Sequence, residues 1–205
     1  RAHEGSGVRL PEHVSASTLV ALGEDRDAVV RQLRRPVPRR PGMAARRGTA
    51  FHAWVEEHFG TSAMLDLEGF DSSDEYVDEA YELGALVEAF KRTEWANRSP
   101  AHVEVPIETK VGPVVVRGRI DAVFRDADGR WDLVDWKTGK APRGAEAKAR
   151  SVQLAVYRLA WSRLTDTPVE EIRAAFCYLA DGTVVRPEAL ATEAELEAIV
   201  ASALE

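Results

Sequence analysis

Cysteine is almost absent from the sequence, and long apolar runs are missing. Cys177 is the only cysteine, which excludes a disulfide framework, a four-cysteine zinc site and a cysteine-ligated iron–sulfur cluster built by this chain alone. So little cysteine is typical of proteins in a reducing cytoplasm, where we expect this protein. The longest apolar runs fall far short of the roughly 20 residues of a membrane-spanning helix, so we expect no membrane partner.

A secretory signal pattern and an initial methionine are also missing, so we expect a fragment or a processed form of a longer protein. What remains is ordinary for a globular protein. The chain has 205 residues, of which 45% are apolar and 30% are charged. This length is sufficient to bury a sizeable core, in one domain or in one domain with extensions.

Acidic residues are missing from residues 28–55, although the net charge of the whole chain is −7. Pro36, Pro38 and Pro41 make the middle of this segment a non-helical connector. The segment is either a solvated linker or a strip that follows nucleic-acid phosphates, which arginine pairs bidentately with release of counterions. Its seven arginines are Arg31, Arg34, Arg35, Arg39, Arg40, Arg46 and Arg47.

The spacing of apolar residues predicts helices first, then three strands in a meander, then a helix and further strands. This order indicates an α/β fold with a mixed sheet. Pro106 places the first strand of the meander at a sheet edge or a bulge. The predicted helices run from Ser15 or Ser17 toward Arg35, from Arg47 to Phe59, onward from a capping box at residues 72–75, from Ala147 to Leu164 and onward from Thr192. The predicted strands surround Val103–Ile107 and cover Pro113–Phe124, Trp131–Lys137, Ile172–Leu179 and Thr183–Arg186.

Two aspartates fall on neighbouring predicted strands. Asp121 follows Gly118 in one strand, and a short hairpin leads to the next strand, in which Asp135 and Lys137 share a face. Two carboxylates brought together raise each other's pKa unless a cation lies between them. Mg²⁺ and Mn²⁺ take such oxygen ligands. Lys137 beside the metal would orient or deprotonate water, or stabilise charge on a phosphate.

Each of these residues also has a purely structural interpretation. An Asp–Lys pair at the end of a strand is commonly a surface ion pair. Gln153 and Tyr157, four residues apart on one helical face, read singly as the polar edge of an amphipathic helix. His52, read singly, is a packed or exposed helical histidine. The residues by themselves leave these alternatives open.

Taken in order, the motifs resemble the RecB-type nuclease domain of the PD-(D/E)xK superfamily. The resemblance implies a restriction-endonuclease-like mixed sheet flanked by helices. It also implies a RecB-like nuclease domain at residues 47–205, after an N-terminal helix and a basic, proline-rich connector at residues 1–46. The resemblance spans roughly residues 46–180 and is carried by Gly48–His52, Glu104, Gly118–Asp121, Asp135–Gly139 and Gln153–Tyr157.

The opening segment and the sequence RGTAFHAWVEEHFG look most like the C-terminal nuclease domain of an actinobacterial, UvrD-like helicase–nuclease subunit of the AdnB type. This resemblance implies a deoxyribonuclease that depends on Mg²⁺ or Mn²⁺ and has no iron–sulfur cluster. It implies single-stranded DNA delivered by a helicase motor in the same polypeptide, a second helicase–nuclease subunit, and a role in double-strand-break end resection. The alternatives are a catalytically inactive DNA-binding module of nuclease fold within a repair complex, and a scaffold domain.

The resemblance also assigns the site residues. The nominal Pro-Asp of the superfamily is Ile120-Asp121 here, as is usual in this branch. Glu104, near Pro106, is expected to be structural or supporting rather than a ligand. The arginines expected to bind DNA are Arg39, Arg40, Arg46 and Arg47. The expected metal ligands are His52, Asp121 and Asp135, and the expected catalytic set is Asp121, Asp135, Lys137, Gln153 and Tyr157.

Overall fold

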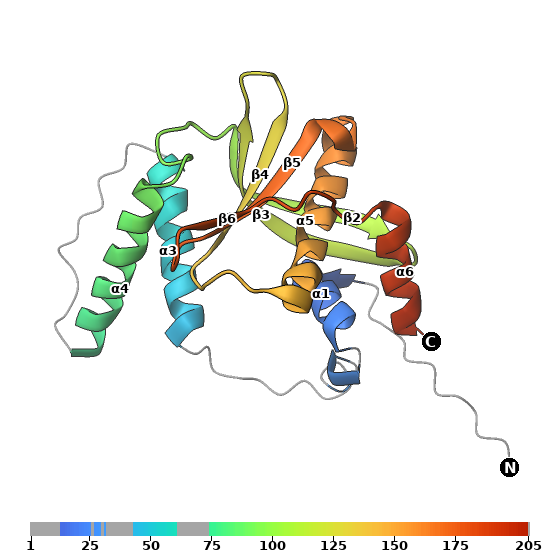
Figure 1. Ribbon diagram of the computed structural model, residues 1–205, viewed down its shortest axis with the longest axis horizontal. Helices are drawn as coiled ribbons and strands as arrows, with labels where there is room; N and C mark the ends of the chain where they lie inside the picture. The colour runs from blue at the N-terminus through green and yellow to red at the C-terminus, as the bar shows by residue number, and fades with distance from the viewer. Residues whose placement is uncertain (1–12, 26, 30, 32–42, 61–73, 205) are drawn as a thin grey trace, which may run out of the picture.

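The computed structural model describes residues 13–25, 27–29, 31, 43–60 and 74–204. A six-stranded mixed sheet forms its centre, and helices flank this sheet (Figure 1). The fold is therefore the α/β arrangement with a mixed sheet that the sequence predicts. The strands are β1 (His13–Ser15), β2 (His102–Val111), β3 (Val114–Arg125), β4 (Trp131–Lys137), β5 (Ile172–Tyr178) and β6 (Thr183–Val185).

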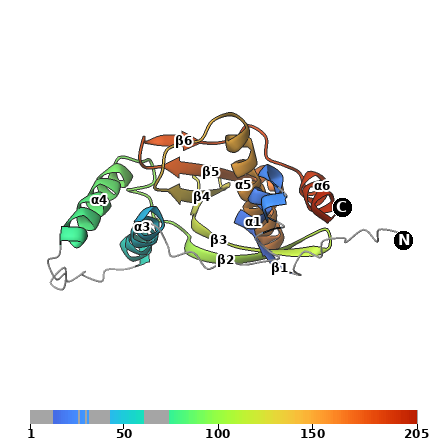
Figure 2. The same cartoon turned by 90° about the horizontal axis from the view of Figure 1, so that it is seen from below.

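The helices form two groups. Helices α1, α5 and α6 lie together at one end of the molecule, and α3 and α4 lie together at the other (Figure 2). Among the described helices, none is both long and apolar enough to cross a membrane. The helices are α1 (Ala16–Glu24), α3 (Met43–Gly60), α4 (Asp74–Lys91), α5 (Gly144–Thr165) and α6 (Glu193–Leu204), with a short 3₁₀ helix at Val169–Glu171.

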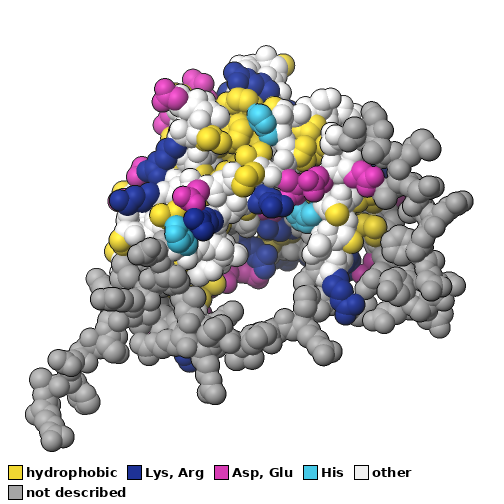
Figure 3. Space-filling view, turned by 180° about the vertical axis from the view of Figure 1, so that it is seen from behind, with side chains coloured by type: hydrophobic (Ala, Val, Ile, Leu, Met, Phe, Trp, Pro, Cys, Tyr) yellow, Lys and Arg dark blue, Asp and Glu magenta, His cyan; other side chains and the backbone are white. Residues whose placement is uncertain are grey.

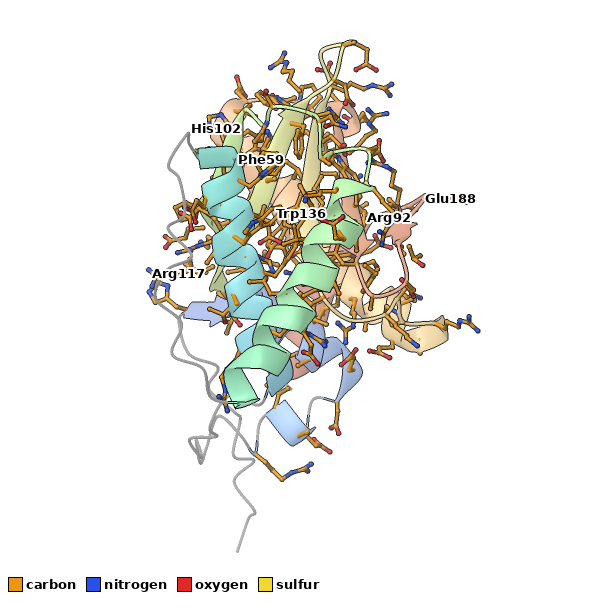
Figure 4. The ribbon with its side chains drawn as sticks, turned by 90° about the vertical axis from the view of Figure 1, so that its left-hand side faces the viewer. Phe59, Arg92, His102, Arg117, Trp136 and Glu188 are labelled. Carbon is orange, nitrogen blue, oxygen red and sulfur yellow. The ribbon has the colours of Figure 1, made fainter. Side chains whose placement is uncertain are left out.

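Two apolar cores follow from this arrangement. The larger core joins the sheet to α1, α5 and α6, and Ile120 and Leu154 are fully buried in it. The smaller core joins the sheet to α3 and α4, and Phe51, Phe90 and Trp136 pack in it. Figure 4 shows Trp136 behind α3 and α4. The predicted apolar stripes of these two helices therefore do face the sheet.

Strand β3 has three neighbours, and their register opens a gap beside it. Antiparallel β2 follows one edge of β3 over residues 114–123. The other edge is shared, because parallel β1 pairs with residues 115–117 and antiparallel β4 pairs with residues 122–125. Among the described strands, none pairs with residues 118–121 on this second edge. The gap lies where the sequence has its Gly-x-x-Asp motif.

The observed elements follow the predictions closely, with a few differences. The side chain of Ser15 accepts a hydrogen bond from the backbone N–H of Thr18 and so caps α1, as predicted, but α1 ends at Glu24 rather than continuing toward Arg35. Helix α3 begins at Met43, four residues before the predicted start. The three-residue strand β1 was not predicted. The capping side chains predicted at residues 72 and 73 lie outside the described residues.

Candidate active site

Helix α3 brings His52 to the sheet. Phe51 and Val55, which flank it on the helix, are 0% and 1% exposed and fix this face of α3 against the smaller core. A Cβ on Gly48 would lie 3.8 Å from the Oγ1 of Thr138, so the helix also passes close to the loop after β4. His52 therefore reaches Asp121 of β3 from a helix whose orientation is set by packing.

His52 meets two carboxylates there. Its Nδ1 lies 3.4 Å from Asp121 Oδ1 and 3.7 Å from Glu104 Oε1. One ligand atom of each of these three residues lies within 4.8 Å of the others. The carboxylates come from neighbouring strands: the β2–β3 register pairs Val103 with Ala122 and Val105 with Ile120, and Glu104 and Asp121 lie between these pairs. The backbone of Glu104 is left-handed, with φ of 49°, a conformation that is uncommon for a non-glycine residue.

The backbone of β4 orients Asp121. The N–H of Trp136 donates a 2.7 Å hydrogen bond to Asp121 Oδ2, which leaves Oδ1 directed to His52. The indole of Trp136 is 1% exposed and packs edge-on against Phe90 and Trp95. Aromatic packing on one side of β4 thus fixes the amide that positions a carboxylate on β3.

Asp135 and Lys137 form a second group together with α5. Lys137 Nζ lies 2.7 Å from Asp135 Oδ2 and donates a 3.3 Å hydrogen bond to Gln153 Oε1. Gln153 Nε2 donates to Asp135 Oδ1 at 2.9 Å and to the Tyr157 hydroxyl at 2.6 Å. Gln153 therefore supports Asp135 directly, and Tyr157 supports it through Gln153. Asp135 Oδ2 is buried and is paired with Lys137.

The small size of Gly118 allows Tyr157 to lie against β3. A Cβ on Gly118 would be 3.0 Å from Cε1 of Tyr157 and 3.4 Å from Ile107, closer than most real contacts. The hydroxyl of Tyr157 accepts the hydrogen bond from Gln153 Nε2. Tyr157 thus packs against β3 beside the gap and links this strand to Gln153.

Three acids concentrate negative charge at this point of the sheet. Burial acts to lower the pKa of His52, but its hydrogen bond to Asp121 and the charges of Asp121, Asp135 and Glu104 outweigh burial and raise that pKa to about 9. Burial, followed by the charge of Asp121, raises the pKa of Asp135. Burial and the charge of Asp121 also raise the pKa of Glu104, against the opposing effect of Arg119. The metal-free site therefore holds a protonated imidazole among crowded carboxylates.

This donor set fits a divalent cation. Hard cations such as Mg²⁺ and Mn²⁺ prefer carboxylate oxygens, and an imidazole nitrogen suits Mn²⁺. An open pocket of about 470 Å³ reaches the cluster and is lined by His52, Glu104 and Asp121 together with residues 48–49, 53, 56 and 119. Figure 3 shows acidic, basic and histidine side chains gathered beside a hollow on one face of the molecule.

The structure brings most of the predicted site residues together. His52 and Asp121 share the cluster, and Asp135, Lys137, Gln153 and Tyr157 form the adjoining group. Glu104, which was not expected to be a ligand, contributes an oxygen to the cluster. The sequence signal for Glu104 was its place as a polar residue that alternates with the apolar residues of a predicted strand. Its left-handed backbone conformation cannot be predicted from the sequence.

The predicted arginines are only partly described. Arg39 and Arg40 lie outside the described residues. Arg46 is exposed near the start of α3. Arg47 lies 3.3 Å from Glu82 of α4 and so joins the two helices. Their role in DNA binding stays a prediction.

Comparison with known proteins identifies the family of the chain. Among solved structures, the chain is similar to a protein of Eubacterium rectale named "Putative exonuclease", with 11% identity, a TM-score of 0.58, and coverage of 94% of this chain and 77% of that one. It also matches SSO0001 at 17% identity and a TM-score of 0.46, over 97% of this chain and 77% of that one. No curated protein matches. The profile described as the PD-(D/E)XK nuclease superfamily matches residues 26–205, which include every residue of the cluster, and the chain therefore belongs to that superfamily.

Proposed function

We propose that the chain is a metal-dependent DNA nuclease that hydrolyses phosphodiester bonds of single strands. One observation carries the proposal: ligand atoms of His52, Glu104 and Asp121 lie within 4.8 Å of one another, beside the ion pair of Asp135 and Lys137. A divalent-ion site with an adjoining lysine supplies the parts that metal-assisted phosphodiester hydrolysis requires. The nuclease superfamily to which the chain belongs and a solved neighbour named as an exonuclease support it.

The proposed metal ligands are His52, Asp121 and Asp135, with Glu104 as a further ligand. His52, Glu104 and Asp121 already converge, and Asp135 offers a buried carboxylate oxygen whose partner is Lys137. The bound ion would act as a Lewis acid and lower the pKa of a water molecule. We infer that either Mg²⁺ or Mn²⁺ serves, because the oxygen donors suit both ions and the imidazole favours Mn²⁺.

The chain's own residues would position the reacting groups. Lys137 Nζ is held between Asp135 and Gln153, so its charge is fixed at the edge of the cluster, where it would stabilise a phosphate oxygen or orient the attacking water. Gln153 donates a 2.9 Å hydrogen bond to Asp135 and a 2.6 Å hydrogen bond to the Tyr157 hydroxyl, so Tyr157 supports Asp135 through Gln153. Such fixed orientation lowers the reorganisation that the reaction requires.

The biological setting proposed here rests on the sequence resemblance to AdnB-type subunits. In that setting a helicase motor in the same polypeptide delivers single strands, a second helicase–nuclease subunit is the partner, and the process is double-strand-break end resection in the cytoplasm. We likewise propose that residues 1–46 connect the nuclease domain, residues 47–205, to the motor. The basic character of residues 28–55 supports a connector that lies close to DNA.

Digestion of labelled oligonucleotides tests the proposed function. We expect the protein to shorten single-stranded DNA with Mg²⁺ or Mn²⁺, to be inactive in EDTA, and to lose activity in Lys137→Ala. Lys140→Ala, which removes an exposed lysine just after the same strand, is the matched control. Binding of DNA without cleavage under every metal condition would contradict the proposal and favour the inactive DNA-binding module instead.

A further inference from the structure

Arg119 is the only arginine or lysine among the described residues that line the 470 Å³ pocket. Its side chain is 63% exposed, yet its Nη1 donates a 3.2 Å hydrogen bond to Oε2 of Glu104, whose side chain is 13% exposed. The neighbouring Gly118 packs against Tyr157, so the strand from which the Arg119 side chain emerges is held against α5. An exposed guanidinium is therefore paired with a carboxylate of the candidate metal site.

Glu104 has two sets of neighbours in the metal-free site. Its Oε1 lies 3.7 Å from His52 in the three-residue donor cluster, and its Oε2 accepts the hydrogen bond from Arg119. A divalent ion held by this cluster would attract the same carboxylate, so metal and guanidinium compete for Glu104. Metal binding would therefore leave the guanidinium of Arg119 available to another anion.

We propose that Arg119 is a positioning residue with two successive partners: Glu104 in the metal-free site, and a phosphate of the bound DNA strand once the metal is present. The inference rests on the proposed function and adds a contact to it. Arginine pairs phosphate bidentately, and a guanidinium released from an exposed ion pair loses little, because such pairs contribute little stability. Because Arg119 competes with metal for Glu104 and then favours DNA, it would couple metal binding to strand binding.

Arg117 provides a matched control on the same strand. It lies two residues before Arg119, so both side chains project from one face of β3. It is also exposed, at 55%, and paired with a glutamate, Glu108, at 2.7 Å. Arg117 does not line the pocket, and Figure 4 shows it at an outer edge of the molecule. Arg119→Met and Arg117→Met therefore remove the same charge and the same type of ion pair at different distances from the cluster.

The first measurement uses Mn²⁺ alone, titrated calorimetrically into metal-free protein without DNA. We expect Arg119→Met to bind Mn²⁺ roughly two- to fivefold more tightly than the wild type, since the competitor for Glu104 is gone. Arg117→Met is expected to match the wild type within experimental error. Equal affinities of the two variants would overturn the inference while leaving the proposed nuclease function intact. A wild type that binds no Mn²⁺ would overturn both.

The second measurement is binding of a hydrolysis-resistant, phosphorothioate single strand, with Mn²⁺ and in EDTA. We expect Arg119→Met to lose roughly tenfold in affinity with Mn²⁺ and much less in EDTA, because the phosphate contact forms only in the loaded site. With Mn²⁺, the slope of its log DNA affinity against log salt concentration is expected to flatten by about 0.7. Arg119→Lys, which keeps the charge, is expected to retain most of the slope. Losses of the same size with and without Mn²⁺ would contradict a contact that depends on metal.

Discussion

At the scale of single residues, Asp135 is the side chain whose charge is least favourable without metal. It is 3% exposed, and burial and the charge of Asp121 raise its pKa, although Lys137 opposes this effect. A carboxyl whose pKa is raised in the folded state lowers stability at any pH at which it is ionised. The site therefore retains a carboxylate at the expense of stability, as functional sites often do.

Asp135→Asn is expected to separate stability from activity. The change keeps the shape of the side chain and removes the buried charge, so the unfolding temperature in EDTA at pH 8 should equal or exceed that of the wild type. Cleavage should fall by about a hundredfold or more, because the charge that holds the cation is lost. Thermal unfolding and oligonucleotide digestion check the two parts. Full cleavage by this variant would show that Asp135 is not a metal ligand.

His52 is expected to set the choice of metal in the candidate site. A neutral imidazole nitrogen suits Mn²⁺ better than Mg²⁺, so we expect higher activity with Mn²⁺. His52→Ala should raise the Mn²⁺ concentration needed for half-maximal cleavage by roughly tenfold or more, since even residues behind the ligands contribute that much to affinity. His58→Ala, on the same helix but outside the cluster, is the control. An unchanged metal requirement would mean that His52 only packs on α3.

The stability of the metal-free protein should fall as the pH rises from about 6.5 to 9. The pKa of His52 is raised from 6.5 to about 9, so the stability it contributes is complete below pH 6.5 and is lost as the pH rises through 9. One pKa unit corresponds to about 1.4 kcal/mol, and partial exposure of the imidazole reduces the total to the order of 2 kcal/mol. Denaturant unfolding in EDTA across this range should show the decline in wild type and a smaller one in His52→Ala.

At the scale of secondary-structure elements, the periodicity of apolar residues was sufficient to locate helices and strands that are long or have clear ends. The bounds of β4 match the prediction, because successive residues of this strand point in turn to the two cores. Thr192 and Glu195 form a capping box at the start of α6, the helix predicted to follow Thr192. Strand β1 has three residues, too few for a period to appear in the sequence. The start of α3 at Met43 was not predicted because its first turn contains no acidic residue to mark it.

The residues of the candidate site could be named from the sequence, but their geometry could not. The motifs predicted His52, Asp121 and Asp135, yet only the register of β2 with β3 brings Glu104 and Asp121 together, between the pairs Val103–Ala122 and Val105–Ile120. The positive φ of Glu104 has no sequence signature, since glycine or asparagine would normally mark it. Likewise, the pairing of β3 with two strands along one edge depends on long-range contacts that a local pattern does not encode.

Gly118→Ala should disturb the site through the packing of β3 on α5. The added methyl would lie 3.0 Å from the ring of Tyr157, which is 4% exposed and cannot move without cost. Such overpacking typically costs about 1–3 kcal/mol. We expect lower stability and a roughly tenfold loss of cleavage, as Tyr157 and Gln153 shift away from Asp135. Gly23→Ala, at an open position in α1, should leave cleavage unchanged; similar losses in both variants would rule out a specific contact.

At the scale of the whole molecule, charge is distributed unevenly. The net charge of −7 opposes DNA binding, but residues 28–55 contain no acid. The cluster of carboxylates lies against the helix that ends this segment, since His52 belongs to α3. The arginines predicted to bind DNA therefore precede the predicted metal ligand His52 in the sequence.

Changing Arg39, Arg40, Arg46 and Arg47 together to Gln tests whether this segment binds DNA. Each phosphate contact of a single strand contributes about 0.7 to the slope of log affinity against log salt, so the slope should flatten by roughly two to three units. Cleavage at low DNA concentration should fall, while the rate at saturating DNA should change little because the metal site is untouched. Salt titrations of single-strand binding measure the slope.

A control for net charge changes four exposed cations elsewhere, Lys91, Arg92, Arg125 and Arg130, to Gln. Both variants lower the net charge equally, so a general electrostatic effect would flatten both slopes alike. Arg47 also pairs with Glu82 across α3 and α4, and Arg47→Gln alone measures any loss of stability from that pair. A larger effect of the first four arginines would place the strand along residues 39–47. Equal slopes in the two variants would identify the segment as a solvated linker, because only their positions differ.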